Sequence, residues 1–316
     1  MIALIQRHGA LAVLVVLLAV GGLSFDTFLT PYSLTNMAVQ ATFLAVVALG
    51  MTMVIITGGI DLSVGSVYAL AGVLAAYGSA RWGLAGGLLL PLAVSGLIGL
   101  TQGVLVARGR MAPFIVTLCG LLFARGLLQL VTVEGSMTYQ VPDSSALRTV
   151  GQGTVLVAIA VVCYLLGGAV LQRTPFGMRL FAIGGNEDAA SLMGLPVART
   201  KVSVYLMSGL LAGLAGVMQT AQSGSGVTNI GVGLELSAIA AAVIGGTMLT
   251  GGSGAVSGTL AGVALLSVIR ELINQLGIDS NMQNVVSGAV LIIVVVLQTL
   301  LTRARRRASE VEHVPQ

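Results

Sequence analysis

A succession of apolar runs, about ten in number and most of them close to the ~20 residues that cross a bilayer, dominates this chain of 316 residues. Only 8% of the residues are charged and 56% are hydrophobic, whereas a soluble domain carries about 25% charged residues. Most side chains must therefore face lipid or other apolar helices. The candidate spans are residues 9–28, 37–57, 64–80, 84–107, 113–132, 154–171, 202–222, 234–250, 253–272 and 282–302.

The backbone within these runs must satisfy its own hydrogen bonds, because lipid offers no partners, and only helices and closed barrels achieve this. A barrel strand would alternate apolar and polar residues, and that alternation is absent. We therefore predict an all-α integral membrane protein with about ten transmembrane helices. We assign residues 1–302 to the transmembrane domain and residues 303–316 to a basic, polar cytoplasmic tail.

The basic residues indicate how the chain is oriented. If the N-terminus is cytoplasmic, the inner segments carry 11 of the 15 lysines and arginines, and the outer segments carry three. The positive-inside rule favours this topology, which leaves both termini in the cytoplasm. The first run could be a signal peptide, but we expect an uncleaved span, because a chain with many later spans needs no cleaved signal.

Glycine spacing predicts close helix packing. Small residues four apart let two helix backbones approach each other in lipid. A Thr-Gly-Gly triplet also ends two of the runs, at residues 57–59 and 250–252. This echo either reflects duplicated halves or arises by chance in a chain rich in glycine and alanine. The glycines at four-residue spacing are Gly99 and Gly103, Gly209 and Gly213, and Gly254, Gly258 and Gly262.

The chain has no nucleotide-binding motif of its own. A phosphate-binding P-loop requires GxxxxGK[ST], whereas the only lysine here is Lys201, which follows Thr200. Uphill solute movement would then need a separate ATPase or an ion gradient. Cys119 and Cys163 lie within apolar runs and are expected to be small buried hydrophobes rather than a disulfide or metal ligands. We predict no catalytic residue, no metal site, no cofactor bound by this chain and no nucleic-acid partner.

Few ionisable residues fall within the runs, although an ion-coupled carrier typically places several there. Arg125 either lines a pathway, pairs with an acid, pins two helices together or extends toward the outer interface. Glu235 is expected to favour a helix N-terminus rather than to bind a solute.

The segment 57–66 ends one run and opens the next. Gly58 and Gly59 permit backbone conformations that are closed to other residues, and Asp61 or Ser63 can cap the following helix. The segment is either a capped turn or a gating hinge near the cytoplasmic mouth. The translocation and gating candidates are Gly58, Gly59, Asp61, Ser63, Arg125 and Glu235.

The long inner loop after the sixth run carries the strongest site signal. Asn186 is a good N-cap, two acidic residues follow it, and Gly194 and then Pro196 end the helix. We predict a two-turn helix, too short to span, on the cytoplasmic face. It would present Leu192 and Met193 as a docking helix for a separate ATPase, or else rest on lipid headgroups. The candidate docking residues are Gly185, Asn186, Glu187, Asp188, Ala189, Ala190, Leu192, Met193 and Gly194.

At these segments the chain resembles the ribose-type (simple-sugar) permease family of bacterial ABC importers. Residues 50–66, which include Gly-Gly-Ile-Asp-Leu-Ser-Val-Gly-Ser, contain the family's most characteristic sequence. Residues 176–186 match its cytoplasmic loop, and residues 235–252 match a third block. The similarity covers nearly the whole chain in order. Residues 120–126 together with 133–136 are most similar to galactofuranose-type permeases.

This resemblance implies a permease subunit of a sugar importer in the inner membrane of a bacterium. It implies a second permease subunit, identical or different, ATPase subunits that carry ATP and Mg²⁺, and an extracytoplasmic sugar-binding protein. Residues 185–195 would be the coupling helix that sits in an ATPase groove. Transport would proceed by alternating access.

Three other functions are consistent with the residues. The first is an ion-coupled secondary transporter, which would work in sealed vesicles without ATP. The second is a permease of a related importer for another solute, such as branched-chain amino acids. The third is a membrane scaffold that transports nothing and does not stimulate a partner ATPase.

Overall fold

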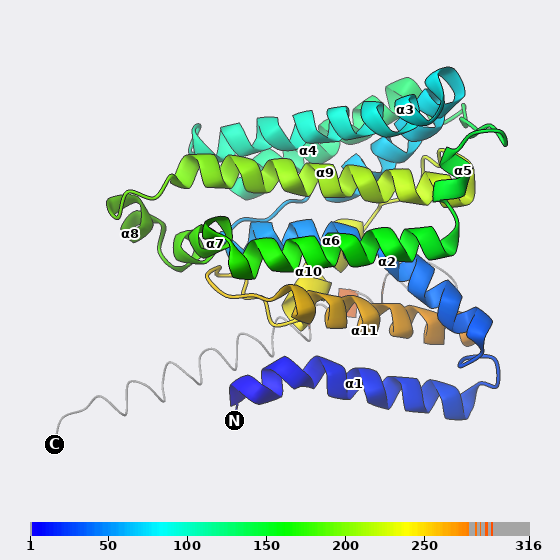
Figure 1. Ribbon diagram of the computed structural model, residues 1–316, viewed down its shortest axis with the longest axis horizontal. Coiled ribbons are helices and arrows are strands. Elements are labelled where there is room, and N and C mark those ends of the chain that lie inside the picture. The colour runs from blue at the N-terminus through cyan, green and yellow to red at the C-terminus, as the bar shows by residue number, and fades with distance from the viewer. Residues whose placement is uncertain (1, 278–281, 283–284, 286–287, 290–291, 293–316) are drawn as a thin grey trace.

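The computed structural model describes residues 2–277 together with residues 282, 285, 288, 289 and 292, with side chains from residue 12 onward. Long helices lie side by side in a bundle, and the described chain contains no strand beyond an isolated bridge between Gln140 and Ser225 (Figure 1). The elements are α1 (Ile2–Ser24), α2 (Pro31–Ile56), α3 (Val64–Ala107), α4 (Pro113–Val131), α5 (Leu147–Val150), α6 (Gly153–Arg173), α7 (Pro175–Gly185), α8 (Glu187–Leu192), α9 (Val197–Ser223), α10 (Leu234–Ile244) and α11 (Val256–Gln275).

Six helices of the described chain are long and apolar enough to cross a membrane, namely α2, α3, α4, α6, α9 and α11. The apolar part of α1, Ala12–Ser24, and α10 are shorter. The all-helical prediction is therefore confirmed, and the count of about ten spans is not. The predicted span 282–302 lies almost entirely outside the described residues, and the predicted tail 303–316 lies wholly outside them.

The helix α3 is two helices in one. Its helical geometry is interrupted at Trp82 and Gly83, where Gly83 has φ +61°, a conformation that favours glycine. The chain then folds back and brings Gly78 against Gly86. A Cβ added to Gly78 would lie 2.3 Å from the carbonyl oxygen of Gly86. The predicted spans 64–80 and 84–107 correspond to these two limbs.

The helix α10 is shorter than the predicted span 234–250. It ends at Ile244, and Gly246 follows with φ +90°. Gly245 lies so close to Gly258 of α11 that an added Cβ would be 2.2 Å from the Gly258 carbonyl carbon. The chain leaves the helix there because the backbones touch, although the sequence stays apolar to residue 250.

The glycine spacing correctly predicted close packing. An added Cβ at Gly99 of α3 would lie 3.2 Å from the Gly209 Cα of α9, and one at Gly103 would lie 2.8 Å from the Val202 Cα. In the other half of the bundle, Gly262 of α11 packs on the backbone of Ala241 in α10. Small residues at these points let the helices lie backbone to backbone.

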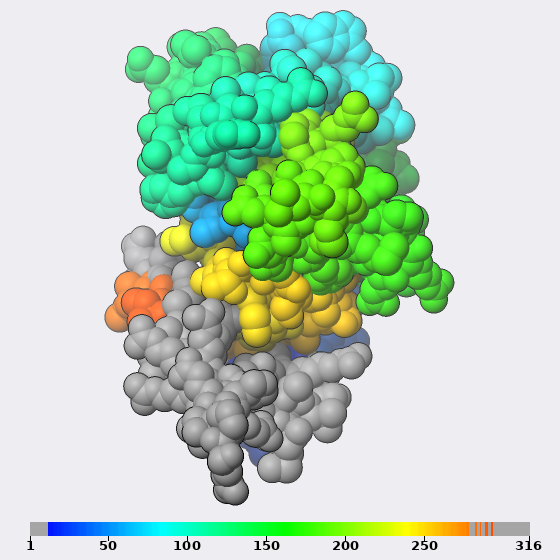
Figure 2. All heavy atoms as spheres, turned by 90° about the vertical axis from the view of Figure 1, so that its left-hand side faces the viewer, coloured from blue at the N-terminus to red at the C-terminus, as the bar shows by residue number. Residues whose placement is uncertain are grey.

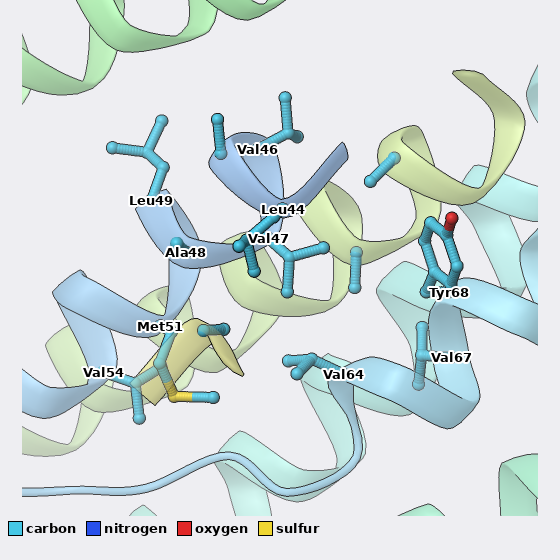
Figure 3. Close-up of a cluster of buried hydrophobic side chains, with 14 of the residues drawn as sticks. Leu44, Val46, Val47, Ala48, Leu49, Met51, Val54, Val64, Val67 and Tyr68 are labelled. Atoms are coloured by element: carbon cyan, nitrogen blue, oxygen red, sulfur yellow. The ribbon is translucent and has the colours of Figure 1, made fainter. Parts of the chain in front are cut away.

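The helix α2 lies at the centre of the bundle. It contacts α6, α9, α10 and α11, and its side chains from Phe43 to Ile56 are buried. Figure 3 shows Leu44, Val47 and Met51 of this helix beside Val64 and Tyr68 of α3. A helix that is apolar on every side is stable only when protein or lipid surrounds it, and here protein does so.

Candidate coupling surface and transmembrane breaks

A short helix, α8, projects from the end of the bundle at which the chain begins (Figure 1). The Asn186 side chain accepts a hydrogen bond from the Ala189 N–H at 2.9 Å, and Gly194, with φ +78°, follows the helix. The acidic residues Glu187 and Asp188 occupy its first turn, where the helix dipole favours them. The capped helix predicted from the sequence is present, and it spans six residues.

The tip of α8 is the most exposed apolar part of this end. Leu192 is 89% exposed and Met193 is 70% exposed, whereas Ala190 is fully buried. Glu187 forms an ion pair with Lys201 of α9, which ties the helix to the bundle. Figure 2 looks onto this end, and the lime-green atoms of the region around α8 and the start of α9 stand forward on it. An anchored helix with an exposed apolar tip suits insertion into a groove of another protein.

The end of α7 packs backbone to backbone against two non-helical segments, the one after α2 and the one before α11. A Cβ added to Gly184 would lie 1.7 Å from the Ile56 carbonyl oxygen and 2.5 Å from the Gly252 nitrogen. The Gly252 N–H donates to that same Ile56 oxygen at 2.9 Å. Gly251 in turn lies against Gly58, since its added Cβ would be 2.9 Å from the Gly58 nitrogen. We call Ile56, Gly58, Gly184, Gly251 and Gly252 the glycine junction.

The glycine junction brings the two Thr-Gly-Gly triplets into contact. The first triplet follows α2, and the second precedes α11. Gly184 lies two residues before Asn186, the cap of α8. The end of α7, which leads into α8, is therefore in backbone contact with the end of α2 and with the loop before α11.

Asp61 lies beyond the first triplet and is buried, with only 1% of its surface exposed. Its carboxylate accepts from the Ser63 N–H at 3.0 Å, from Ser63 Oγ at 2.7 Å and from Ser208 Oγ of α9 at 2.7 Å. Ser63 stands at the N-cap of α3 but makes no side-chain cap bond. The expected cap is thus absent, because the Ser63 hydroxyl donates to Asp61 instead. Gly59 leaves room for Tyr205 Oη, which would lie 2.5 Å from an added Cβ.

Gln102 of α3 completes this polar cluster. Its Oε1 lies 3.2 Å from Ser63 Oγ, and its Nε2 is buried without a hydrogen-bond partner in the described structure. Gly120 of α4 faces that amide, since an added Cβ would be 1.9 Å from Nε2. Neither Gln102 nor Ser208 was among the residues predicted from the sequence. The available signal was a polar residue inside an otherwise apolar run.

Arg125 and Glu235 lie at another non-helical segment, the connection between α9 and α10. The Arg125 guanidinium donates to the Thr228 carbonyl oxygen at 3.1 Å and to the Ile230 carbonyl oxygen at 3.4 Å. Glu235, in the first turn of α10, accepts from the Gly233 N–H at 3.3 Å. Arg125 therefore pins α4 to this connection.

The predicted translocation candidates thus form three groups rather than one pocket. Gly58 belongs to the glycine junction, and Gly59 packs against Tyr205. Asp61 and Ser63 form the buried cluster, and Arg125 and Glu235 lie at the connection between α9 and α10. Both cysteines are free thiols, but neither is buried as expected, since Cys119 is exposed and Cys163 is half-buried. Within the described residues no three His, Cys, Asp or Glu side chains gather as metal ligands would.

Comparison with known proteins places these features in a family context. Residues 33–295 match the family described as branched-chain amino acid transport system / permease component. The chain is 37% identical to the ribose import permease protein of Bacillus subtilis (strain 168) over 299 residues, 92% of each chain. It is 35% identical to the L-arabinose ABC transporter permease protein of Azospirillum brasilense over 318 residues, 98% of this chain and 91% of that one. An inner membrane ABC transporter permease protein of Escherichia coli (strain K12) is 39% identical over 293 residues, 88% of this chain and 87% of that one. No solved structure matches the chain significantly.

Proposed function

The chain belongs to the ribose-type permease family of ABC importers, and we propose that it is the membrane-spanning subunit of a bacterial importer for a simple sugar. The structural observation that carries the proposal is α8, a capped helix with an exposed apolar tip on a chain that has no nucleotide-binding motif. Such a helix supplies the contact that a separate ATPase needs.

The proposed mechanism is alternating access driven from α8. ATP and Mg²⁺ bind to the partner ATPase, whose closure displaces α8. The glycine junction transmits this displacement to α2 and α11, because Gly184 touches Ile56 and Gly252 directly. Packed backbones move as units rather than deform. The pathway then opens in turn to each side of the membrane.

The assembly proposed here contains two permease subunits, identical or different, together with ATPase subunits and an extracytoplasmic sugar-binding protein. The chain would lie in the inner membrane with both termini in the cytoplasm, so that α8 faces the ATPase. The six long apolar helices support a multi-pass membrane protein. No nucleic acid takes part.

Reconstitution in proteoliposomes tests the proposal. The chain is combined with an ATPase and a sugar-binding protein of this importer class, and ATP hydrolysis and uptake are measured with ribose, arabinose, fructose, galactofuranose and leucine. We expect a sugar to stimulate hydrolysis and to accumulate only with ATP. Uptake driven by an ion gradient without ATP would refute the proposal. Stimulation of ATP hydrolysis by leucine alone would show that the transported solute is an amino acid rather than a sugar.

The docking role of α8 has its own test. Reversing both acidic charges in its first turn, Glu187→Arg with Asp188→Arg, should abolish ATP-driven uptake, because it opposes the helix dipole and removes the ion pair with Lys201. Asp143→Arg is the control, since Asp143 is an exposed, ion-paired acid far from α8 in the sequence. Normal uptake by the double variant would disprove docking through α8.

A further inference from the structure

The connection between α9 and α10 runs along the first limb of α3 without forming a helix. It begins beside the loop after α4, where the Gly226 N–H donates to the Tyr139 carbonyl oxygen at 2.8 Å. An added Cβ at Gly226 would lie 2.8 Å from the Val73 Cα, and one at Gly231 would lie 2.2 Å from the Gly65 carbonyl oxygen. The segment 226–233 therefore follows the first limb of α3 over eight residues, about 12 Å of helix.

The backbone of this segment lacks the hydrogen bonds that lipid demands. The amides of residues 227–232 have no hydrogen-bond partner anywhere in the described part of the chain. The carbonyl oxygens of Thr228 and Ile230 are both taken by Arg125. Non-helical backbone at membrane depth persists only where protein satisfies it or where it lines a water-filled cavity. The described residues do not satisfy these amides, which leaves them to water.

The exposure of two side chains also indicates that this segment faces water. Asn229 is exposed, and Val232 is 73% exposed, although both lie on the segment that follows the inner half of a membrane-spanning limb. A carboxamide facing lipid would cost several kcal/mol. The Arg125 guanidinium donates to two carbonyl groups and lies within electrostatic range of Glu235, so these donors are not available to a solute.

We propose that residues 226–233 form one wall of the translocation pathway, along which the hydroxyl groups of a neutral sugar replace water on the free amides and on the Asn229 side chain. This inference rests on the proposed import function. Arg125 is a positioning residue: it holds two carbonyl groups away from the pathway so that the intervening amides face it. Donors of this kind bind a hydroxyl weakly, which suits a solute that must also leave.

Cysteine accessibility tests this wall. Both native cysteines are first removed, with Cys119→Ser and Cys163→Ser, and Asn229→Cys or Val232→Cys is then introduced. The complete transporter in proteoliposomes is treated with a charged, membrane-impermeant methanethiosulfonate reagent, with and without ATP plus vanadate. Leu122→Cys in α4 and Leu166→Cys in α6 are the controls, since their side chains are 64% and 62% exposed on long apolar helices.

We expect cysteines at residues 229 and 232 to react at least about tenfold faster than the two controls, because a thiolate attacks the reagent and thiolates form in water. Saturating transported sugar should slow that reaction. Reaction no faster than at the controls in both nucleotide conditions, or reaction that the sugar leaves unchanged, would overturn the proposal. Uptake by the cysteine-free parent is measured in parallel. If the parent imports sugar but the cysteines at residues 229 and 232 are not labelled faster than the controls, the wall alone is refuted. If these cysteines are labelled but the parent imports no sugar, the sugar-import function is refuted.

Discussion

Gly184→Ala should uncouple ATP hydrolysis from transport. The added methyl group would lie 1.7 Å from the Ile56 carbonyl oxygen, whereas a real Cβ essentially never comes within 3.0 Å of another heavy atom. The end of α7 and the end of α2 must therefore separate by about 1.3 Å or more, because backbone cannot rotate away as a side chain can.

The free-energy cost follows from two terms. Overpacking in a close-packed site costs roughly 1–3 kcal/mol. The hydrogen bond from the Gly252 N–H to the Ile56 oxygen, 2.9 Å long, occupies the same space, and its loss adds about 1 kcal/mol. The engaged form of the glycine junction then loses about 2–4 kcal/mol, which is roughly a 30- to 1,000-fold change in its equilibrium.

The assay compares uptake per ATP hydrolysed in proteoliposomes that contain the complete transporter. We expect Gly184→Ala to lower this ratio at least about tenfold while ATP hydrolysis by the partner continues. Gly168→Ala in α6 is the control, because an added Cβ there meets nothing within 4 Å. Both changes gain the same helix propensity, about 0.5–1 kcal/mol, so the difference isolates the steric contact. Equal ratios for the two variants would show that the glycine junction transmits nothing.

Three further substitutions test the remaining contacts. Ser208→Ala removes a 2.7 Å hydrogen bond to the buried Asp61 carboxylate and should lower the free energy of unfolding by about 1.5–3 kcal/mol. Thermal unfolding in detergent measures this, and an unchanged melting temperature would show that the hydrogen bond does not stabilise the fold. Asn186→Ala should destabilise α8 by about 1 kcal/mol and weaken ATPase binding several-fold, and Asn186→Ser should restore both. The affinity of each variant for the ATPase is measured by titration, and equal affinities would show that the Asn186 cap does not support docking. Arg125→Gln should reduce sugar uptake at least about tenfold, and Arg125→Lys should retain more of it by keeping one donor for the carbonyl groups of the α9–α10 connection; wild-type uptake by the Gln variant would rule out positioning by Arg125.

The local parts of this structure could be predicted from the sequence. The α8 helix is specified by Asn186, the acidic residues after it and Gly194, all within nine residues, so no distant contact is needed to form it. The spans that became α4, α6 and α9 are single apolar runs with clear ends. Glycine spacing also marked the closest helix pairs, because backbone approach in lipid depends on residue size alone.

The break after residue 56 was predicted, but the early end of α10 was not, because an apolar run looks the same in a helix and in a buried loop. Residues 245–250 continue the apolar run of α10, and the Gly245-Gly246 pair was the one local signal that the helix ends there. Asp61 and Ser63 were singled out, but their partners lie far along the chain: Ser208 is 147 residues from Asp61, and Gln102 is 39 residues from Ser63. Arg125 reaches the carbonyl group of Thr228, 103 residues along the chain. Pairings of that separation are set by the tertiary fold.

The central position of α2 has a consequence for how the protein is made. The helices that enclose α2 are α6, α9, α10 and α11, and the first of these begins at residue 153. When the ribosome has finished α2, almost none of its final neighbours exists. The nascent helix must therefore wait in the bilayer with lipid around it, and the interior can close only after most of the chain has been inserted.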